Sequence, residues 1–94
     1  MADTITVIHD GAEFEFEPAR LNDIRFTMAL ADISDETVDD RETLMAYGTM
    51  VRVLFGAKRY AVLAKLENDD GIVTADAFNA FFSDLLEQAK AKNS

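Results

Sequence analysis

Residues 66–82 read LENDDGIVTADAFNAFF, an acidic turn with a glycine that leads into a phenylalanine-rich helix. The same order of features occurs in the second half of an EF-hand. An EF-hand loop needs an oxygen ligand at position 1, glycine at position 6 and a bidentate carboxylate at position 12. With Gly71 at position 6, positions 1 and 12 fall on Leu66 and Ala77, whose side chains carry no oxygen. We therefore predict a joint between two helices and no metal site.

In such a joint, each polar residue of the stretch has a structural part. Residues 68–71 form the turn, and Gly71 can take a positive φ after the end of the preceding helix. Thr74 is expected to cap the next helix, and Asp76 lies in the positive first turn of that helix. The stretch thus predicts where one helix stops and the next begins.

On both sides of this joint, hydrophobic residues recur at helical spacing. They predict a bundle of about four helices at approximately residues 21–33, 39–55, 57–66 and 75–91. The first helix is expected to bury a face of Leu21, Ile24, Met28 and Ala31, which Phe26, Leu30 and Ile33 widen.

The second predicted helix is the most apolar and is expected to be central. Its apolar residues are Leu44, Met45, Tyr47, Met50, Val51, Val53, Leu54 and Phe55. Gly48 inside it costs about 1 kcal/mol relative to alanine. We expect that the hairpin or another helix packs closely against Gly48.

Residues 4–18, TITVIHDGAEFEFEP, predict a β-hairpin with a two-residue turn at Asp10-Gly11. Phe14 and Phe16 point to one side and the intervening glutamates to the other. A hairpin alone is marginal in water, so its phenylalanine face should lie on helices. The predicted fold is α+β, mainly α, in a single domain of residues 1–94: a hairpin (4–17), a helical bundle (21–91) and a tail (92–94).

Composition removes several classes of function. The chain of 94 residues has no cysteine, which excludes disulfides and thiolate zinc sites, and its single His9 cannot form a multi-histidine metal site. A net charge of −9 argues against binding to nucleic acid. The N-terminus lacks the pattern of a signal peptide and no stretch has the length of a membrane span, so we expect a cytoplasmic protein without membrane contact.

We expect no catalytic, cofactor-binding or metal-binding residue. The hydroxyl residues lack a histidine-based partner set, and the four glycines are too scattered to form a phosphate loop. The acidic pairs Asp39–Asp40 and Asp69–Asp70 lie in hydrophilic turns, whereas acid–base catalysis needs a desolvated carboxylate.

A partner-binding surface is the remaining prediction. Phe81 and Phe82 point about 100° apart on a helix, and a small domain is not expected to cover both. Phenylalanines and methionines together are typical of an adaptable groove for a helix or for a second copy of the chain. The alternative, in which both rings belong to the core, stays open. The predicted surface consists of Met45, Met50, Phe78, Phe81, Phe82 and Leu85.

The order of features over residues 12–91 resembles a known family. The strand end FEFEP, the segment ARLNDIRFTMALADI, an acidic break, a helix ending in VLFG and the segment AKRYAVLAKLENDDGIVTADAFNAFFSDLLEQA follow one another. In this order the chain is similar to the small tail assembly chaperones of long-tailed, siphovirus-type bacteriophages and prophages of Gram-positive bacteria. None of these pieces is a catalytic signature.

This resemblance implies a non-enzymatic helper in the host bacterial cytoplasm. Such proteins bind the tape-measure protein, keep its hydrophobic helices soluble and help to recruit tail-tube subunits. Two other classes are weighed beside it: a degenerate EF-hand-like module, suggested by residues 66–78, and an acidic regulator or antitoxin-type interaction module, suggested by the net charge.

Overall fold

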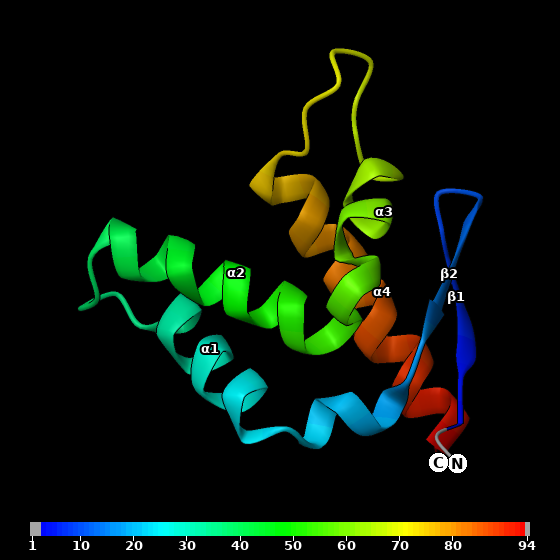
Figure 1. The fold of residues 1–94 in the computed structure, drawn as a ribbon, viewed down its shortest axis with the longest axis horizontal. Coiled ribbons are helices and arrows are strands. Elements are labelled where there is room, and N and C mark those ends of the chain that lie inside the picture. The colour runs from blue at the N-terminus through cyan, green and yellow to red at the C-terminus, as the bar shows by residue number, and fades with distance from the viewer. Residues whose placement is uncertain (1–2, 94) are drawn as a thin grey trace.

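A β-hairpin and a set of helices make up the fold in the computed structural model, which describes residues 3–93 (Figure 1). The elements in chain order are β1 (Ile5–His9), β2 (Ala12–Phe16), the 3-10 helix η1 (Pro18–Asn22), α1 (Ile24–Ser34), α2 (Asp40–Phe55), the 3-10 helix η2 (Gly56–Lys58), α3 (Arg59–Ala64) and α4 (Ala75–Asn93). The predicted class, α+β and mainly α with an N-terminal hairpin on helices, is confirmed.

The hairpin has the predicted turn and register. β1 and β2 are antiparallel, and Val7 pairs with Phe14. Asp10 and Gly11 take φ angles of 51° and 80°, the left-handed pair that a two-residue turn between twisted strands requires. Val7, Phe14 and Phe16 are buried while the alternating glutamates of β2 are exposed, so the hairpin has one dry face and one wet face.

Phe81 of α4 lies at the centre of the core and is fully buried. Its ring centroid is 4.6 Å from that of Phe14 on β2, 6.0 Å from that of Phe55 on α2 and 6.4 Å from that of Phe78. The hairpin, α2 and α4 therefore meet at one side chain. The whole core comprises Val7, Phe14, Phe16, Phe26, Ala29, Ala46, Met50, Val51, Val53, Leu54, Phe55, Val62, Phe78, Phe81, Phe82, Leu85 and Ala89.

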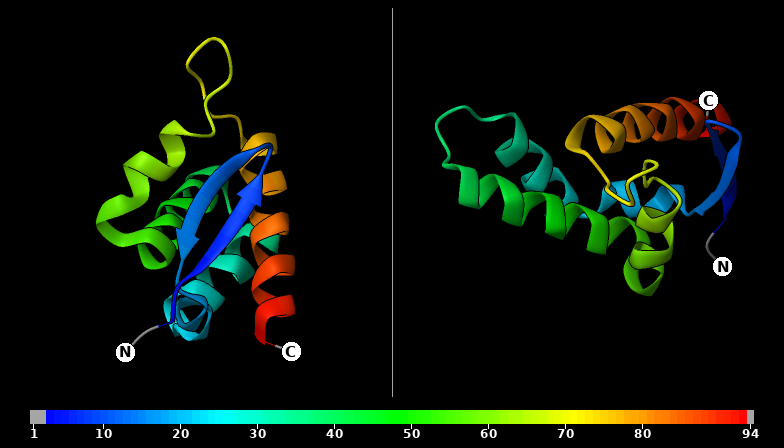
Figure 2. Two further views of the ribbon diagram at one scale, coloured as in Figure 1. Left: turned by 90° about the vertical axis from the view of Figure 1, so that its right-hand side faces the viewer. Right: turned by 90° about the horizontal axis from the view of Figure 1, so that it is seen from above.

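Polar contacts fix the hairpin between α4 and α3, with β1 beside α4 and β2 toward α3 (Figure 2). The amide of Gln88 donates to the Ile8 carbonyl (2.8 Å) and accepts from the Ile8 N–H (2.9 Å), so it pairs with the open edge of β1. His9 Nδ1 lies 2.6 Å from Asp84 Oδ2. On the other side, the Lys65 ammonium donates to the Glu13 carbonyl at 2.6 Å.

α1 and α2 form a helical hairpin that extends away from the β-hairpin (Figures 1 and 2). The expected buried face of the first helix is wrong, because Ile24 and Met28 are 67% and 61% exposed. α1 instead buries Phe26 and Ala29. The pair Ile24 and Met28 and the pair Phe26 and Ala29 both have helical spacing. Burial of the pair that contains the aromatic ring of Phe26 removes more apolar surface from water.

The joint between α3 and α4 forms as predicted and projects from the body of the molecule (Figure 1). Asn68 Oδ1 accepts from the backbone N–H groups of Asp70 (2.9 Å) and Ile72 (3.0 Å), and Gly71 has a φ of 76°. Thr74 Oγ1 accepts from the Ala77 N–H at 3.1 Å, which caps α4. The oxygen of Asn68 thus serves the turn itself.

Helix boundaries differ from the sequence prediction at three places. Residues 18–22 form a 3-10 helix, so α1 begins at Ile24 and not near Leu21. The third helix is divided into η2 and the short α3. α4 continues through Lys92 to Asn93, which were assigned to a tail, and Ser94 lies outside the described residues.

Replacement of a core leucine should separate core from surface in this fold. Leu85 is fully buried, so Leu85→Ala is expected to lower the free energy of unfolding by about 2–5 kcal/mol. Met45 is 65% exposed, so Met45→Ala should change it by less than about 0.5 kcal/mol. Urea unfolding of both variants is the measurement, and equal losses would contradict the assignment.

Candidate functional site: an apolar groove

The predicted partner-binding surface is largely wrong, because five of its six residues belong to the core. Met50, Phe78, Phe81, Phe82 and Leu85 are all buried, and Met45 alone is exposed. They are therefore core residues, as the alternative interpretation of the two phenylalanines had it.

The two adjacent phenylalanines are both covered because α4 has a neighbour on each side. Phe81 contacts Phe14 of the β-hairpin, and Phe82 contacts Phe26 of α1 with 5.9 Å between ring centroids. The angle of about 100° between the two side chains thus directs them to two different neighbouring elements, the β-hairpin and α1. The spacing in the sequence predicts this angle, but it does not predict which elements bury the two rings.

An apolar groove lies beside this core, between α2, α3 and the start of α4. Its volume is about 690 Å³. The lining residues are Leu44, Met45, Tyr47, Gly48, Thr49, Val51, Arg52, Arg59, Tyr60, Leu63, Val73, Thr74, Ala75 and Phe78. Two of the six predicted surface residues, Met45 and Phe78, therefore do line a hollow.

Large apolar side chains stand exposed in this groove. Leu44 and Tyr60 are 70% and 71% exposed, and Met45 is nearly as open. Leu44 and Met45 come from the first half of α2, whereas Tyr60 comes from α3. A smaller hollow between α1 and α2, of about 330 Å³, shares Met45 with the groove. Met45 thus lies where two hollows meet.

Tyr47 of α2 contacts α4 at the edge of the groove. Its ring meets that of Phe78 edge-on at 5.7 Å, and its hydroxyl donates to Asn79 Oδ1 at 3.2 Å. Because Tyr47 is held at both its ring and its hydroxyl, this part of the groove wall is fixed by contacts within the chain. The groove therefore has a formed wall next to its exposed apolar residues.

Gly48 lies in the same groove, and the expected close packing against it is absent. A Cβ atom built at Gly48 meets nothing within 4 Å among the described residues. The β-hairpin packs further along α2, where Phe16 contacts Phe55. Nothing within the described part of the chain explains the glycine.

The charged side chains that line the groove are both arginines. Arg59 donates to the Gly56 carbonyl at 2.8 Å, and its guanidinium lies 4.7 Å from the centre of the Tyr60 ring. Arg52 is exposed, and its side chain makes no hydrogen bond or ion pair with any described residue. The groove is thus locally cationic in a chain whose net charge is −9.

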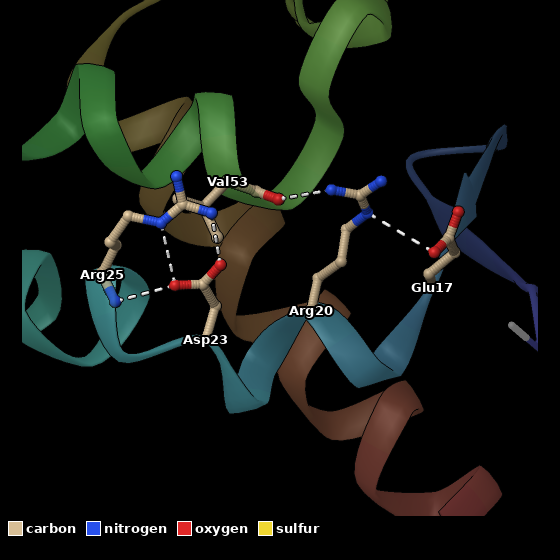
Figure 3. Close-up of polar contacts among 5 residues, drawn as sticks. All are labelled: Glu17, Arg20, Asp23, Arg25 and Val53. Atoms are coloured by element: carbon tan, nitrogen blue, oxygen red, sulfur yellow. Dashed lines mark hydrogen bonds and ion pairs between the residues drawn. The ribbon is translucent and has the colours of Figure 1, made fainter.

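A polar cluster around η1 and the start of α1 is structural (Figure 3). Arg20 Nη1 donates to the Val53 carbonyl near the end of α2 (3.1 Å), and Arg20 Nε lies 3.5 Å from Glu17 Oε2. Asp23 accepts from the Arg25 backbone N–H and from its guanidinium, at 2.6 Å for the shortest contact. The cluster caps the start of α1 and satisfies a carbonyl in the last turn of α2.

Hydrogen bonds from the Arg25 side chain and backbone lower the pKa of Asp23 from 3.8 to about 2. Hydrogen bonds from the Thr37 hydroxyl and backbone lower the pKa of Asp35 in the same way. Both carboxylates are thereby held in their charged form, which suits helix caps and turns. Neither is available as a proton donor near neutral pH.

Features of other kinds of site are missing from the part of the chain that the structure describes. Within residues 3–93, no three histidine, aspartate or glutamate side chains gather closely enough to hold a metal ion. No polar or charged side chain among residues 3–91 is buried. None of its helices combines the length and the apolar character needed to cross a membrane.

Comparison with protein-family models, with curated proteins and with solved structures finds no match for this chain. Sequence reasoning had missed Leu44, Gly48, Arg52 and Tyr60 as members of a groove. The sequence feature that indicated the groove is Gly48. Glycine inside a helix lowers its stability, and the prediction explained Gly48 by close packing within the chain.

Alanine at position 48 should stabilise the fold. Gly48 is in a regular helix with open space beside it, so Gly48→Ala is expected to raise the free energy of unfolding by about 0.5–1 kcal/mol. The matched control is Gly71→Ala, which should lower it by about 1–2 kcal/mol because φ there is positive. Urea unfolding decides, and a destabilised Gly48→Ala variant would show that the position is tightly packed.

The Asp23 cap should make stability depend on pH in acid. Asn retains a capping side chain without the charge, so Asp23→Asn should be less stable than wild type at neutral pH. Because the folded-state pKa lies below the unfolded value, the charge stabilises fully above pH 3.8, and this contribution is lost as the pH falls toward 2.

Urea unfolding of wild type and Asp23→Asn at a series of pH values measures this effect. The difference between the two free energies of unfolding should shrink through that window. Glu36→Gln, at an exposed position between α1 and α2, controls for the change in net charge. A difference that stays constant down to about pH 2 contradicts the account.

Proposed function

We propose that this protein is a non-enzymatic tail assembly chaperone that binds hydrophobic helices of a phage tape-measure protein in its apolar groove. The observation that carries the proposal is the exposure of Leu44, Met45 and Tyr60 around a formed groove. The order of sequence features over residues 12–91 supports the choice of partner. The proposed location is the cytoplasm of the host bacterium, where tails assemble.

The chemistry of the groove suits a helix as ligand. An amphipathic helix presents side chains at spacings of three and four residues, which an apolar groove between helices accommodates. Methionine adapts to varied partners because its side chain is unbranched and polarisable. Full burial of Leu44 and Met45 by a partner contributes about 1.5–3 kcal/mol for each side chain.

The surface of the chain suits the second part of the proposed work. With 18 acidic and 9 basic residues, the protein adds negative charge to any complex that it forms. Like charge on neighbouring complexes opposes their aggregation. A long helical protein covered by several copies thus stays dispersed until tail-tube subunits, which the proposed chaperone helps to recruit, replace it.

The burial pattern also supports binding over catalysis. Acid–base catalysis needs a carboxylate whose pKa is raised by burial, and each carboxylate with a shifted pKa in the described residues has a lowered one. The side chains that cluster in a hollow are apolar ones and two arginines. Such a set recognises a surface and offers no group to attack a bond.

Co-expression with segments of the tape-measure protein encoded beside this chain tests the proposal. We expect the chain to raise the soluble fraction of at least one segment and to copurify with it. Met45→Glu should weaken the complex by more than about tenfold, because a charge then replaces an exposed apolar side chain that the partner would cover.

Ile24→Glu is the matched control for this experiment. Ile24 is also an exposed apolar residue, but it lies at the start of α1, away from the groove lining. Both variants add the same charge. A complex that fails to form with any segment contradicts the function, and equal losses in the two variants contradict the groove as its site.

A further inference from the structure

We propose that the groove selects amphipathic helices whose apolar face is bordered by aspartate or glutamate, and that Arg52 provides the main charge for this selection. The inference deepens the proposed function by naming the chemistry of the partner helix. It depends on that function only for the identity of the partner, because the groove and its two arginines are observed in the structure of this chain without any partner.

The charged residues that line the groove are positive. Acidic residues outnumber basic ones two to one in the chain, yet the charged residues that line the groove are Arg52 and Arg59. Because the Debye length is about 8 Å at physiological ionic strength, charges within the groove act on a docked helix more strongly than carboxylates elsewhere. An acidic border on the ligand therefore complements the groove despite the negative net charge.

Of the two arginines that line the groove, the Arg52 side chain is free to bind such a partner. Arg59 is held by the Gly56 carbonyl and the Tyr60 ring. The guanidinium of Arg52 makes no hydrogen bond or ion pair with a described residue, and its backbone carbonyl accepts from the Gly56 N–H. Its guanidinium can bind a carboxylate in bidentate geometry without breaking a contact in the chain.

Arg52 lies on the same side of α2 as an exposed apolar residue of the groove. Met45, Gly48 and Arg52 follow one another at spacings of three and four and so lie on one stripe of α2. Met45 and Arg52 are about 10 Å apart along the helix axis, or about two turns. A helix laid in the groove thus meets apolar contacts at one end of the stripe and a positive charge at the other.

Gly48 lies between them and allows a close approach. The missing side chain leaves the α2 backbone open, with nothing from the chain within 4 Å of a Cβ position. Close approach of two helices favours small residues at the crossing point and shortens the distance over which flanking charges act. The glycine that is unexplained within the described chain is explained by a helix that crosses α2 there.

A second copy of this chain is a poorer occupant. The long apolar face of α4 is consumed in the core through Phe78, Phe81 and Leu85. Sedimentation of the free protein should therefore report a monomer, and a dimer in which Met45 is shielded overturns the proposal.

Three synthetic helical peptides of equal length test the inference directly. They share one apolar face, which is bordered by Glu, by Gln or by Lys, and their affinities are measured by fluorescence anisotropy. Wild-type protein should bind the Glu-bordered peptide about three- to tenfold more tightly than the Lys-bordered one. Equal affinities, or a preference for the Lys-bordered peptide, overturn the proposal.

Arg52→Glu and Lys58→Glu form a matched pair of variants, because both lower the net charge by two. Arg52 lines the groove, whereas Lys58 is an exposed residue outside its lining, next to Glu15. Arg52→Glu should reverse the preference for the Glu-bordered peptide, and Lys58→Glu should preserve it. Equal effects of the two variants would show that net charge alone is responsible and overturn the assignment to Arg52.

The outcomes separate this inference from the proposed function. Binding of tape-measure segments without any peptide charge preference removes the inference and leaves the function. A clear preference for the acidic peptide together with no binding of tape-measure segments removes the function and leaves the inference.

Discussion

The aromatic contacts of Phe81 are the constraint on which the rest of the structure depends. This ring is fully buried and touches Phe14 of the hairpin and Phe55 of α2. A two-stranded hairpin is marginal in water, and its buried face packs on Phe81, which contacts Phe14, and on Phe55, which contacts Phe16. The neighbouring Phe82 holds α1 through Phe26, so one dipeptide of α4 organises both hairpins of the fold.

This arrangement explains why a groove remains. α4 directs its largest side chains toward the β-hairpin and α1, and the second half of α2 fills the space between them with Met50, Leu54 and Phe55. The first half of α2 extends beyond this core, where Leu44 and Met45 have no cover. The exposed apolar surface is therefore a consequence of how the core is built, and it has a fixed shape because the core fixes its walls.

Sequence reasoning succeeded where a local rule applied. Asp10-Gly11, Asn68–Gly71 and Thr74 each act through backbone φ or a hydrogen bond within a few residues, and each took its predicted part. The prediction failed where two faces of one helix had equally regular apolar spacing. The spacing of Ile24 and Met28 fits a buried face as well as the spacing of Phe26 and Ala29 does. Only the positions of α2 and α4 determine which of the two faces is buried. The groove was not predicted because its lining residues come from three helices, whose relative positions local sequence rules do not determine.

Chemical-shift mapping of the methyl groups during titration with a tape-measure segment tests the central claim most directly. The account predicts that the methyl signals of Leu44, Met45, Leu63 and Val73 move, while those of Ile8 and Ile24, which are exposed elsewhere, stay in place. Shifts confined to the outer face of α1, or loss of the core signals of Leu85, would contradict it, because the ligand would then bind another surface or require the fold to open.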